Sequence, residues 1–164
     1  MKTLVPSKID CLLVSLLAIL AIPVFFYRLG SPTVKDWDEA RHAQNAFEIV
    51  KNKEWISITY DGKPDLLNLK PPLGAWLIAI SFKLFGFHEF ALRFWSAFFG
   101  TSTLLLLYFF GRNIKNRQVG ALSSIMLLSD PHFVNFHAGR AGDYDVPMVF
   151  FITASLYLFW LSQK

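Results

Sequence analysis

The feature that most constrains this chain is a run of 17 residues without a charge, CLLVSLLAILAIPVFFY, at positions 11–27. A helix needs roughly 20 predominantly apolar residues to cross the hydrocarbon core of a bilayer. The run therefore predicts a membrane span over about residues 10–28. Composition agrees, since 54% of the residues are hydrophobic and 17% are charged, against about 45–50% and about 25% in soluble domains. We expect an integral membrane protein.

Three further apolar segments, at about residues 92–111, 118–137 and 145–162, predict an all-α, polytopic fold with about four transmembrane helices. The segment 118–137 contains Asp130, Pro131 and His132 about two-thirds of the way along. Because proline disrupts the interior of a helix, we expect this span to be kinked or terminated near Pro131. Residues 1–164 are interpreted as a single transmembrane module.

Two weaker helices are predicted between the first and second spans. Residues 39–52 place Ala40, Ala43 and Phe47 at helical spacing among polar residues, which is typical of an amphipathic helix. Residues 72–87 contain only ten consecutive residues free of proline and charge. That is too few to cross a membrane comfortably, so an interfacial or re-entrant helix is favoured. An ordinary crossing is the alternative for this segment.

The short loops predict the orientation of the chain. The link GRNIKNRQ carries three basic residues and no acid, and the N-terminus carries Lys2 and Lys8 ahead of Asp10. Short cytoplasmic loops are enriched in basic residues, so we expect both segments to be cytoplasmic, with the first span as an uncleaved anchor. The two acidic clusters of the chain then lie together on the non-cytoplasmic face.

These acidic clusters are the candidate functional residues. Asp36, Asp38 and Glu39 follow the first span, and Asp143 and Asp145 precede the last one. Acids at a helix start can simply cap free N–H groups. Acids at a membrane face are also costly to bury without partners, and such a carboxylate can have its pKa adjusted for proton abstraction. Two clusters delivered by different loops to one face would suit a site that activates a hydroxyl.

An anion site, suited to phosphate, is predicted near the sequence NLKPPL. Pro72 can start a helix whose free N–H groups hold an anion, and Lys70 stands just before it as a point charge suited to phosphate. The alternative is an ordinary helix start with a lysine that extends to the interface. No tract of basic and aromatic residues indicates nucleic-acid binding. The histidines lack metal-ligand spacing, so we interpret them as interface or hydrogen-bonded residues, namely His42, His88, His132 and His137.

The order of these parts resembles a known family. One span is followed by D-E-x-R, an amphipathic helix, KPPLGAWL, a Phe-rich segment with Arg93, a basic turn and GRAGDYD before another span. This is similar to the N-terminal module of the membrane-bound GT-C glycosyltransferases. The nearest resemblance is to the superfamily of protein mannosyltransferases and aminoarabinose (lipid A) transferases, glycosyltransferase family 39 or 83-like. The resemblance covers essentially the whole chain.

The resemblance implies an enzyme of the cell (inner) membrane that takes a sugar from a polyprenyl-phosphate carrier. The sugar would pass, with inversion, to a hydroxyl of a lipid, glycan or protein acceptor on the periplasmic or extracellular face. No cofactor or metal is implied. The family has many more spans than this chain, so the resemblance implies an N-terminal part of a longer protein. A non-catalytic membrane subunit or truncated remnant is the alternative, and a transporter segment is a further one.

The family motifs assign expected roles by position. Asp38 matches the acid that serves as catalytic base, Glu39 is its motif partner, and Asp145 with its neighbour Asp143 matches the acid of the second outer loop. Donor phosphate is expected to bind three basic residues, Lys70, Arg41 and Arg140. Leu69 stands where many relatives of the aminoarabinose type carry a glutamate before the Lys-Pro pair. This departure weakens an assignment to lipid A.

Overall fold

The computed structural model describes residues 6–66, 68–135 and 138–163. Lys2 and His137 therefore lie outside the described residues. Three helices are long and apolar enough to cross a membrane, by length and composition: α1 (Lys8–Phe26), α4 (Glu89–Ile114) and α7 (Asp145–Ser162). The predicted class, a helical membrane protein, is confirmed.

The segment predicted as a span at 118–137 is divided into two helices. Helix α5 (Arg117–Leu128) ends just before the proline, and the short α6 (Pro131–Asn135) follows it. The residue before a proline is disfavoured in the helical conformation, which explains why α5 stops there. Helix α5 packs tightly against α4 at Gly120. A Cβ on this residue would lie 2.3 Å from the Tyr108 carbonyl oxygen, so the close approach requires glycine.

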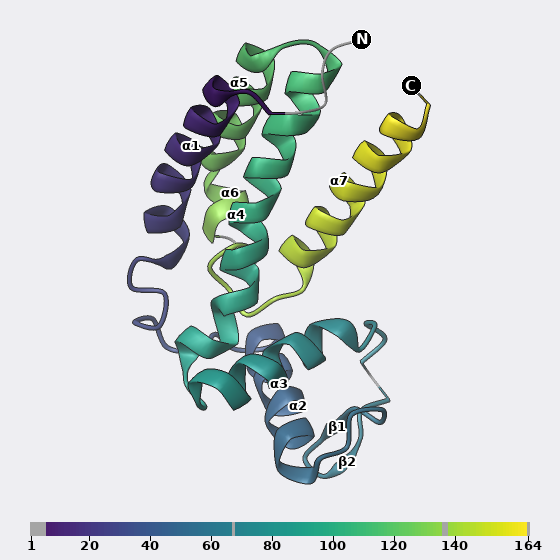
Figure 1. The fold of residues 1–164 in the computed structure, drawn as a ribbon. Coiled ribbons are helices and arrows are strands. Elements are labelled where there is room, and N and C mark those ends of the chain that lie inside the picture. Colours follow the sequence, from purple (N-terminus) through teal and green to yellow (C-terminus); the bar gives the residue numbers. More distant parts are fainter. Residues whose placement is uncertain (1–5, 67, 136–137, 164) are drawn as a thin grey trace.

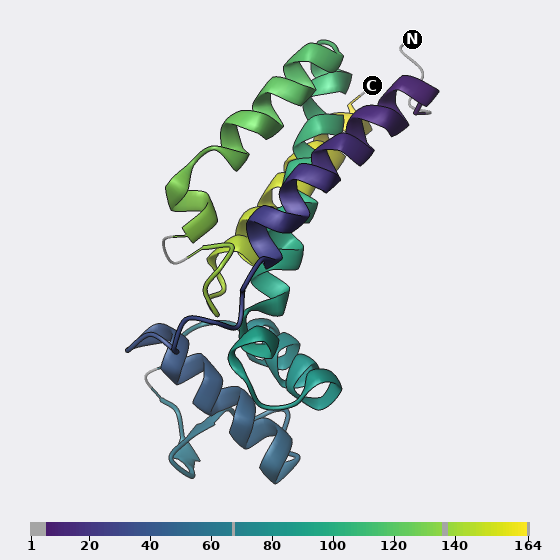
Figure 2. The ribbon, with the colours of Figure 1, turned by 90° about the vertical axis from the view of Figure 1, so that its left-hand side faces the viewer.

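The bundle formed by α1, α4, α5 and α7 has two chemically different ends. Figures 1 and 2 place the start of α1 and the end of α7 at the same end of this bundle, beside the α4–α5 link. Asp10 is fully buried there, where its carboxylate accepts hydrogen bonds from Tyr108 Oη at 2.8 Å and Arg117 Nε at 2.8 Å. Arg112 Nε lies 3.1 Å from the same carboxylate. The segment 29–87 and the loop before α7 lie at the opposite end.

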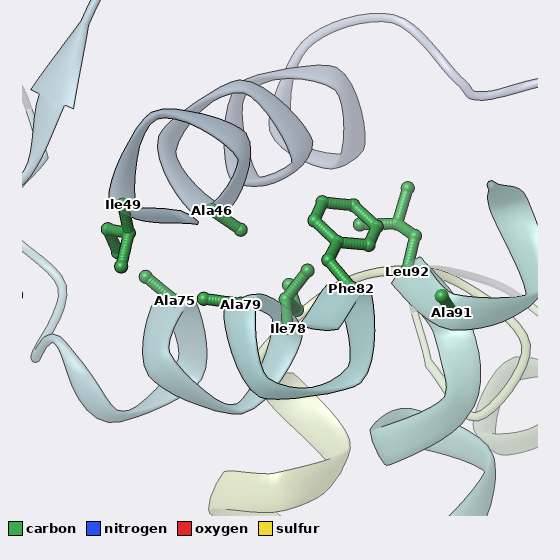
Figure 3. Close-up of a cluster of buried hydrophobic side chains, with 8 residues drawn as sticks. All are labelled: Ala46, Ile49, Ala75, Ile78, Ala79, Phe82, Ala91 and Leu92. Carbon is green, nitrogen blue, oxygen red and sulfur yellow. The ribbon is translucent and has the colours of Figure 1, made fainter. Parts of the chain in front are cut away.

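Helix α3 (Leu73–Phe85) lies across that opposite end of the bundle (Figure 1). Its 13 residues extend about 20 Å, against about 30 Å of hydrocarbon. This length favours an interfacial helix over a crossing. Helix α2 (Asp38–Asn52) packs on α3, and Figure 3 shows the small and aliphatic side chains that meet between them, including Ala46, Ile49, Ala75 and Ala79.

A small hairpin that the sequence analysis did not predict follows α2. Strands β1 (Thr59–Tyr60) and β2 (Lys63–Pro64) pair antiparallel around Asp61 and Gly62. Both turn residues have positive φ, 54° and 72°. An Asp-Gly pair favours this kind of two-residue turn, so the signal was present in the sequence. The hairpin brings Asp65 back against α2, where Asn45 donates a hydrogen bond to its carboxylate.

Candidate active site

The Lys70 side chain brings the two acidic clusters together. Its Nζ atom lies 3.8 Å from Asp38 Oδ1 and 3.5 Å from Asp143 Oδ1. Asp38 is the first residue of α2, whereas Asp143 lies in the loop just before α7. A single ammonium group thus connects residues that are about a hundred positions apart in the sequence. This juxtaposition is what the two-cluster hypothesis predicted.

The two carboxylates differ in their access to solvent. The Asp38 side chain is 52% exposed, whereas that of Asp143 is 5% exposed. Asp143 is also tied down, because its Oδ1 accepts a hydrogen bond from the Tyr144 amide and its carbonyl oxygen accepts one from Ser96 Oγ. Asp38 is therefore the carboxylate that an incoming hydroxyl can reach, and Asp143 is a fixed negative charge behind the lysine.

His42 provides a third contact for Lys70. Its Nε2 atom lies 3.4 Å from Lys70 Nζ, and its Nδ1 atom lies 3.0 Å from the Gly142 carbonyl oxygen. Burial lowers the pKa of His42, and the nearby Lys70 charge lowers it further, against the opposing effects of the Gly142 carbonyl and Asp143. A carbonyl can only accept, so Nδ1 carries the proton of the neutral ring. The Nε2 lone pair then faces the lysine.

Tyr144 forms one wall of this cluster. Its ring stacks on the His42 ring with centroids 3.8 Å apart, and Lys70 Nζ lies 5.4 Å from the Tyr144 ring centroid. Gly74 makes room for the ring, since a Cβ there would lie 2.3 Å from Tyr144 Cδ1. Burial raises the pKa of Tyr144 above its usual value, and Asp143 raises it further. The buried Tyr144 hydroxyl has no hydrogen-bond partner in the part of the chain that the structure describes.

Glu39 lies inside the protein, paired with Arg93. It is 4% exposed, and its two oxygens accept hydrogen bonds from Arg93 Nε at 2.7 Å and Nη2 at 2.9 Å. The amides of Lys35 and Gly142 donate two more, each at 2.7 Å. A carboxylate offers about four acceptor sites, so those of Glu39 are all occupied. Glu39, the predicted partner of the catalytic base, is thus buried and paired with Arg93, and its catalytic role stays a prediction.

The environment keeps Glu39 ionised. Burial by itself would raise the pKa of this carboxyl, but the hydrogen bonds from Arg93, Lys35 and Gly142 outweigh it and hold the pKa below its usual value. Glu39 and His42 are three residues apart on α2 and share one face of the helix. Glu39 accepts from the Gly142 amide, and His42 donates to the Gly142 carbonyl. The two side chains thus fix the second acidic loop to α2 at a single residue, Gly142.

Arg41 pairs with an acidic side chain of the hairpin segment, and its predicted contact with a donor phosphate stays a prediction. Its guanidinium pairs with Asp65 through two hydrogen bonds, one of them from Nε at 3.0 Å, and it lies over the Tyr60 ring at 5.4 Å. Asp65 is 3% exposed. The pair therefore anchors the hairpin to α2. The pair uses Nε and Nη2 of Arg41, whose side chain is 32% exposed.

Arg140 is also engaged elsewhere. Its guanidinium donates to the carbonyl oxygens of Val24 at 2.7 Å, Phe25 at 3.2 Å and Tyr27 at 2.8 Å. The last carbonyls of a helix lack partners within the helix, so Arg140 caps the end of α1. Of the three basic residues expected at the donor phosphate, Lys70 is the one whose charge lies between the acidic clusters.

A cavity of about 230 Å³ adjoins the cluster. Lys70 and Asp145 line its polar edge, and the side chains of α3 and α7 that line the rest are mainly apolar, among them Leu77, Met148 and Phe151. Asp145, the first residue of α7, is exposed there. The site thus joins a cation to an apolar wall. Among residues 6–66, 68–135 and 138–163, no three histidine, cysteine or acidic side chains come together as a metal site.

Three contributors to the cluster were not predicted as site residues: His42, Gly142 and Tyr144. The helical spacing of His42 from Asp38 and Glu39 was an available signal, because residues three and four positions apart share a helix face. Gly142 and Tyr144 flank Asp143 in the motif GDYD. Their contacts with His42 and Gly74 depend on tertiary packing, which the spacing of residues does not show.

Known proteins match this chain in sequence and in fold. Residues 69–163 match the family described as dolichyl-phosphate-mannose-protein mannosyltransferase. The chain is 36% identical over 142 residues to an uncharacterized protein of Aquifex aeolicus, covering 85% of this chain and 28% of that protein. It is 32% identical over 160 residues to undecaprenyl phosphate-alpha-4-amino-4-deoxy-L-arabinose arabinosyl transferase 2 of Proteus mirabilis, covering 94% of this chain and 27% of that protein.

A solved structure shares the fold. The crystal structure of ArnT from Cupriavidus metallidurans bound to undecaprenyl phosphate superposes with a TM-score of 0.83 at 22% identity, covering 92% of this chain and 27% of that one. The present chain thus spans only about a quarter of the length of the proteins that it matches. Since the family match covers more than half of its residues, this chain belongs to the dolichyl-phosphate-mannose-protein mannosyltransferase family, within the glycosyltransferase superfamily that its motifs resemble.

Proposed function

We propose that this chain carries the catalytic face of a membrane glycosyltransferase. The enzyme moves a sugar from a polyprenyl-phosphate carrier to an acceptor hydroxyl. The observation that carries this proposal is the position of Lys70, whose ammonium lies between Asp38 and Asp143 beside an apolar cavity. A phosphate needs the cation, a prenyl chain needs the apolar wall, and a hydroxyl needs an accessible base.

The donor is proposed to bind with its phosphate at Lys70 and the start of its prenyl chain along the cavity between α3 and α7. Lysine binds phosphate as a point charge, and helix α3 begins three residues further along the chain, where its free amides favour an anion. The name of the Proteus mirabilis relative includes undecaprenyl phosphate, and the Cupriavidus metallidurans protein was crystallised bound to the same compound. Both agree with a donor of this class.

Asp38 is proposed as the general base. Its carboxylate takes the proton from the acceptor hydroxyl as that oxygen attacks the anomeric carbon of the sugar. The bond from this carbon to the carrier phosphate breaks, and the configuration inverts because a single displacement takes place. Lys70 stabilises the charge that develops on the departing phosphate. Asp143, held by the Tyr144 amide, lies 3.5 Å from the lysine and limits where its ammonium can go.

The same geometry supports an orientation. The starts of α2 and α7, which carry the acidic clusters, lie at one end of the bundle, and the basic α4–α5 link, the start of α1 and the end of α7 lie at the other (Figure 1). By the positive-inside rule the basic end is cytoplasmic. Sugar transfer is then proposed on the periplasmic or extracellular face of the cell (inner) membrane, to a lipid, glycan or protein hydroxyl. Leu69 in place of a glutamate disfavours lipid A as the acceptor.

The proposal is tested by sugar transfer from a radiolabelled polyprenyl-phosphate sugar in membranes that contain the complete gene product. Asp38→Asn is compared with Asp36→Asn, a neighbouring exposed acid. General-base assistance is typically worth ~10²–10⁴-fold in rate, so we expect a loss of that order for Asp38→Asn and near-normal transfer for Asp36→Asn. Full activity of Asp38→Asn at equal expression would reduce Asp38 to a helix cap. A wild type without transfer would favour a non-catalytic subunit.

A further inference from the structure

We infer that His42 is a positioning residue of the donor site, which holds the Lys70 ammonium through its Nε2 lone pair and keeps the lysine between Asp38 and Asp143. The inference rests on the proposed function, because it gives Lys70 a defined place for the donor phosphate. His42 itself is 2% exposed and does not touch the reacting atoms in this assignment. Its role is to set where the cation stands.

The His42 ring is held in one orientation. Its Nδ1–H donates to the Gly142 carbonyl oxygen at 3.0 Å, and one ring face stacks on Tyr144 at 3.8 Å between centroids. Gly142 is in turn fixed by its amide, which donates to the buried Glu39 carboxylate. Because both ends of this chain of contacts are anchored, the direction of the Nε2 lone pair is set before any ligand arrives.

Lys70 needs such a guide more than its neighbours do. Its side chain is 40% exposed and has a flexible four-carbon stem. Asp38 and Asp143 attract the ammonium but lie at 3.8 Å and 3.5 Å, at or beyond the limit of a hydrogen bond. A carboxylate that gripped the lysine closely would compete with the donor phosphate. A neutral imidazole orients the ammonium and leaves its positive charge available.

The arrangement depends on the protonation of His42. The charged and titratable groups that face the ring are Lys70, Asp143, Asp38 and Tyr144. Once His42 is protonated, Nε2 carries a hydrogen that points at the Lys70 ammonium, so two positive groups face each other. Because burial and Lys70 hold the pKa of His42 below its usual value, the ring stays neutral at pH 7 and donor binding should weaken only under acid conditions.

Two substitutions test separately the contacts made by the two ring nitrogens of His42. In His42→Asn the amide can still reach the Gly142 carbonyl, but the shorter side chain loses the contact with Lys70. In His42→Gln the longer side chain can present its carbonyl oxygen to Lys70 without titrating. His132→Asn is the matched control, since the His132 side chain is 81% exposed and lies on α6. All are made in the complete gene product and assayed for sugar transfer against donor concentration and pH.

We expect His42→Asn to raise the donor KM by about tenfold, as loss of a hydrogen bond to a charged group does, while kcat changes little. His42→Gln should keep a donor KM near that of wild type and lose the rise in KM that wild type shows at acid pH. A fall in kcat with unchanged donor KM in His42→Asn would overturn the inference. So would an acid rise in donor KM that persists in His42→Gln.

A measurement without turnover keeps this inference separate from the proposed function. Lysine amines are labelled by reductive ¹³C-methylation, and the Lys70 resonance is assigned with Lys70→Arg. We expect it to shift in His42→Asn and to stay near its wild-type position in His42→Gln and His132→Asn. An unmoved Lys70 resonance in His42→Asn would contradict the contact itself. Absence of sugar transfer by wild type together with the expected shifts would instead contradict the proposed function alone.

Discussion

Arg93 and Glu39 form a buried ion pair in which every hydrogen-bonding site is used. The guanidinium gives two of its five N–H groups to Glu39, and the other three go to the carbonyl oxygens of Leu29, Pro32 and Thr33. Glu39 accepts two further bonds from backbone amides. A buried charge is costly unless it is paired and hydrogen-bonded, and here that condition is met on both sides.

Removing one partner of this pair should destabilise the protein. We expect Glu39→Gln to lower the free energy of unfolding by about 3–5 kcal/mol, because it leaves the Arg93 charge buried without its counter-ion. The measurement is the melting temperature in detergent, with the exposed Glu54→Gln as control. A stable Glu39→Gln protein that has lost only sugar transfer would return Glu39 to the catalytic role that the motif implied.

Gly142 should not tolerate a side chain. A Cβ at this position would lie 2.6 Å from Leu92 Cγ and 3.2 Å from Glu39 Cγ, so Gly142→Ala must displace the loop that carries Asp143. We expect lower stability and lower transfer, since overpacking a tight contact typically costs about 1–3 kcal/mol. Both are measured in the single variant and in the double variant with Leu92→Ala.

The double variant is decisive, because the smaller side chain gives the new methyl group room. The combined effect of Gly142→Ala and Leu92→Ala should be smaller than the sum of the two single effects, as expected for residues in contact. Simple additivity would mean that the predicted clash between these two residues does not exist in the protein.

Arg41 should behave as the partner of Asp65 and not as a ligand of the donor. We expect Arg41→Gln and Asp65→Asn to lower the melting temperature alike and to leave the donor KM near that of wild type, because each releases the hairpin from α2. Lys70→Gln provides the comparison, with a raised donor KM. If Arg41→Gln raises the donor KM about tenfold and Asp65→Asn does not, Arg41 binds the phosphate as the family motif suggested.

The free energy of unfolding should fall in two stages as the pH is lowered. The folded protein holds the pKa of His42 below its ordinary 6.5. As the pH drops through about 6.5, the unfolded state therefore binds a proton that the folded state does not bind, and the free energy of unfolding falls. Glu39 acts lower, since its folded pKa is below the ordinary 4.5 and its contribution is lost as pH falls through the folded value. Melting temperature measured from about pH 8 to about pH 3, a range that extends below both ordinary pKa values, should show the upper stage and the onset of the lower one.

His42→Gln removes the group responsible for the upper stage. We expect its melting temperature to stay level between about pH 7 and pH 5.5, the range in which an ordinary histidine titrates. A decline in this range as steep as that of wild type would show that other groups cause it.

The helical membrane class was predictable from local signals in the sequence, and the predicted topology placed the two acidic clusters on one face. Runs without charge mark α1, α4 and α7, and Pro131 marks the break after α5. The partners of the basic residues were not predictable in this way. Arg41 meets Asp65, 24 residues later, through a hairpin that was not recognised. Arg140 donates to backbone carbonyls at the end of α1. Such carbonyls are present at every helix end, so no residue type in the sequence marks them as its partners.

The position of His42 shows the same limit. Its helical spacing from Asp38 was visible in the sequence, but its two ring contacts come from Lys70 and Gly142, which are 28 and 100 residues away. Residues that belong to one motif also had different outcomes. Asp38 and Glu39 are adjacent in D-E-x-R, yet one is half exposed beside Lys70 and the other is buried against Arg93. Neighbouring side chains on a helix point in different directions, and packing decides which one is buried.

Arginine contacts fix the length of the backbone between α1 and α2, which limits where residues can be inserted. Arg140 and Arg93 together bind six carbonyl oxygens, two in the last turn of α1 (Val24 and Phe25) and four in the segment that follows it (Tyr27, Leu29, Pro32 and Thr33). An inserted residue would shift the later carbonyl oxygens away from the Arg93 N–H groups, because Arg93 is fixed by its buried pair with Glu39. Epitope tags or glycosylation acceptors for mapping topology therefore belong at the exposed turn of Asp61 and Gly62, where the chain can lengthen without losing these contacts.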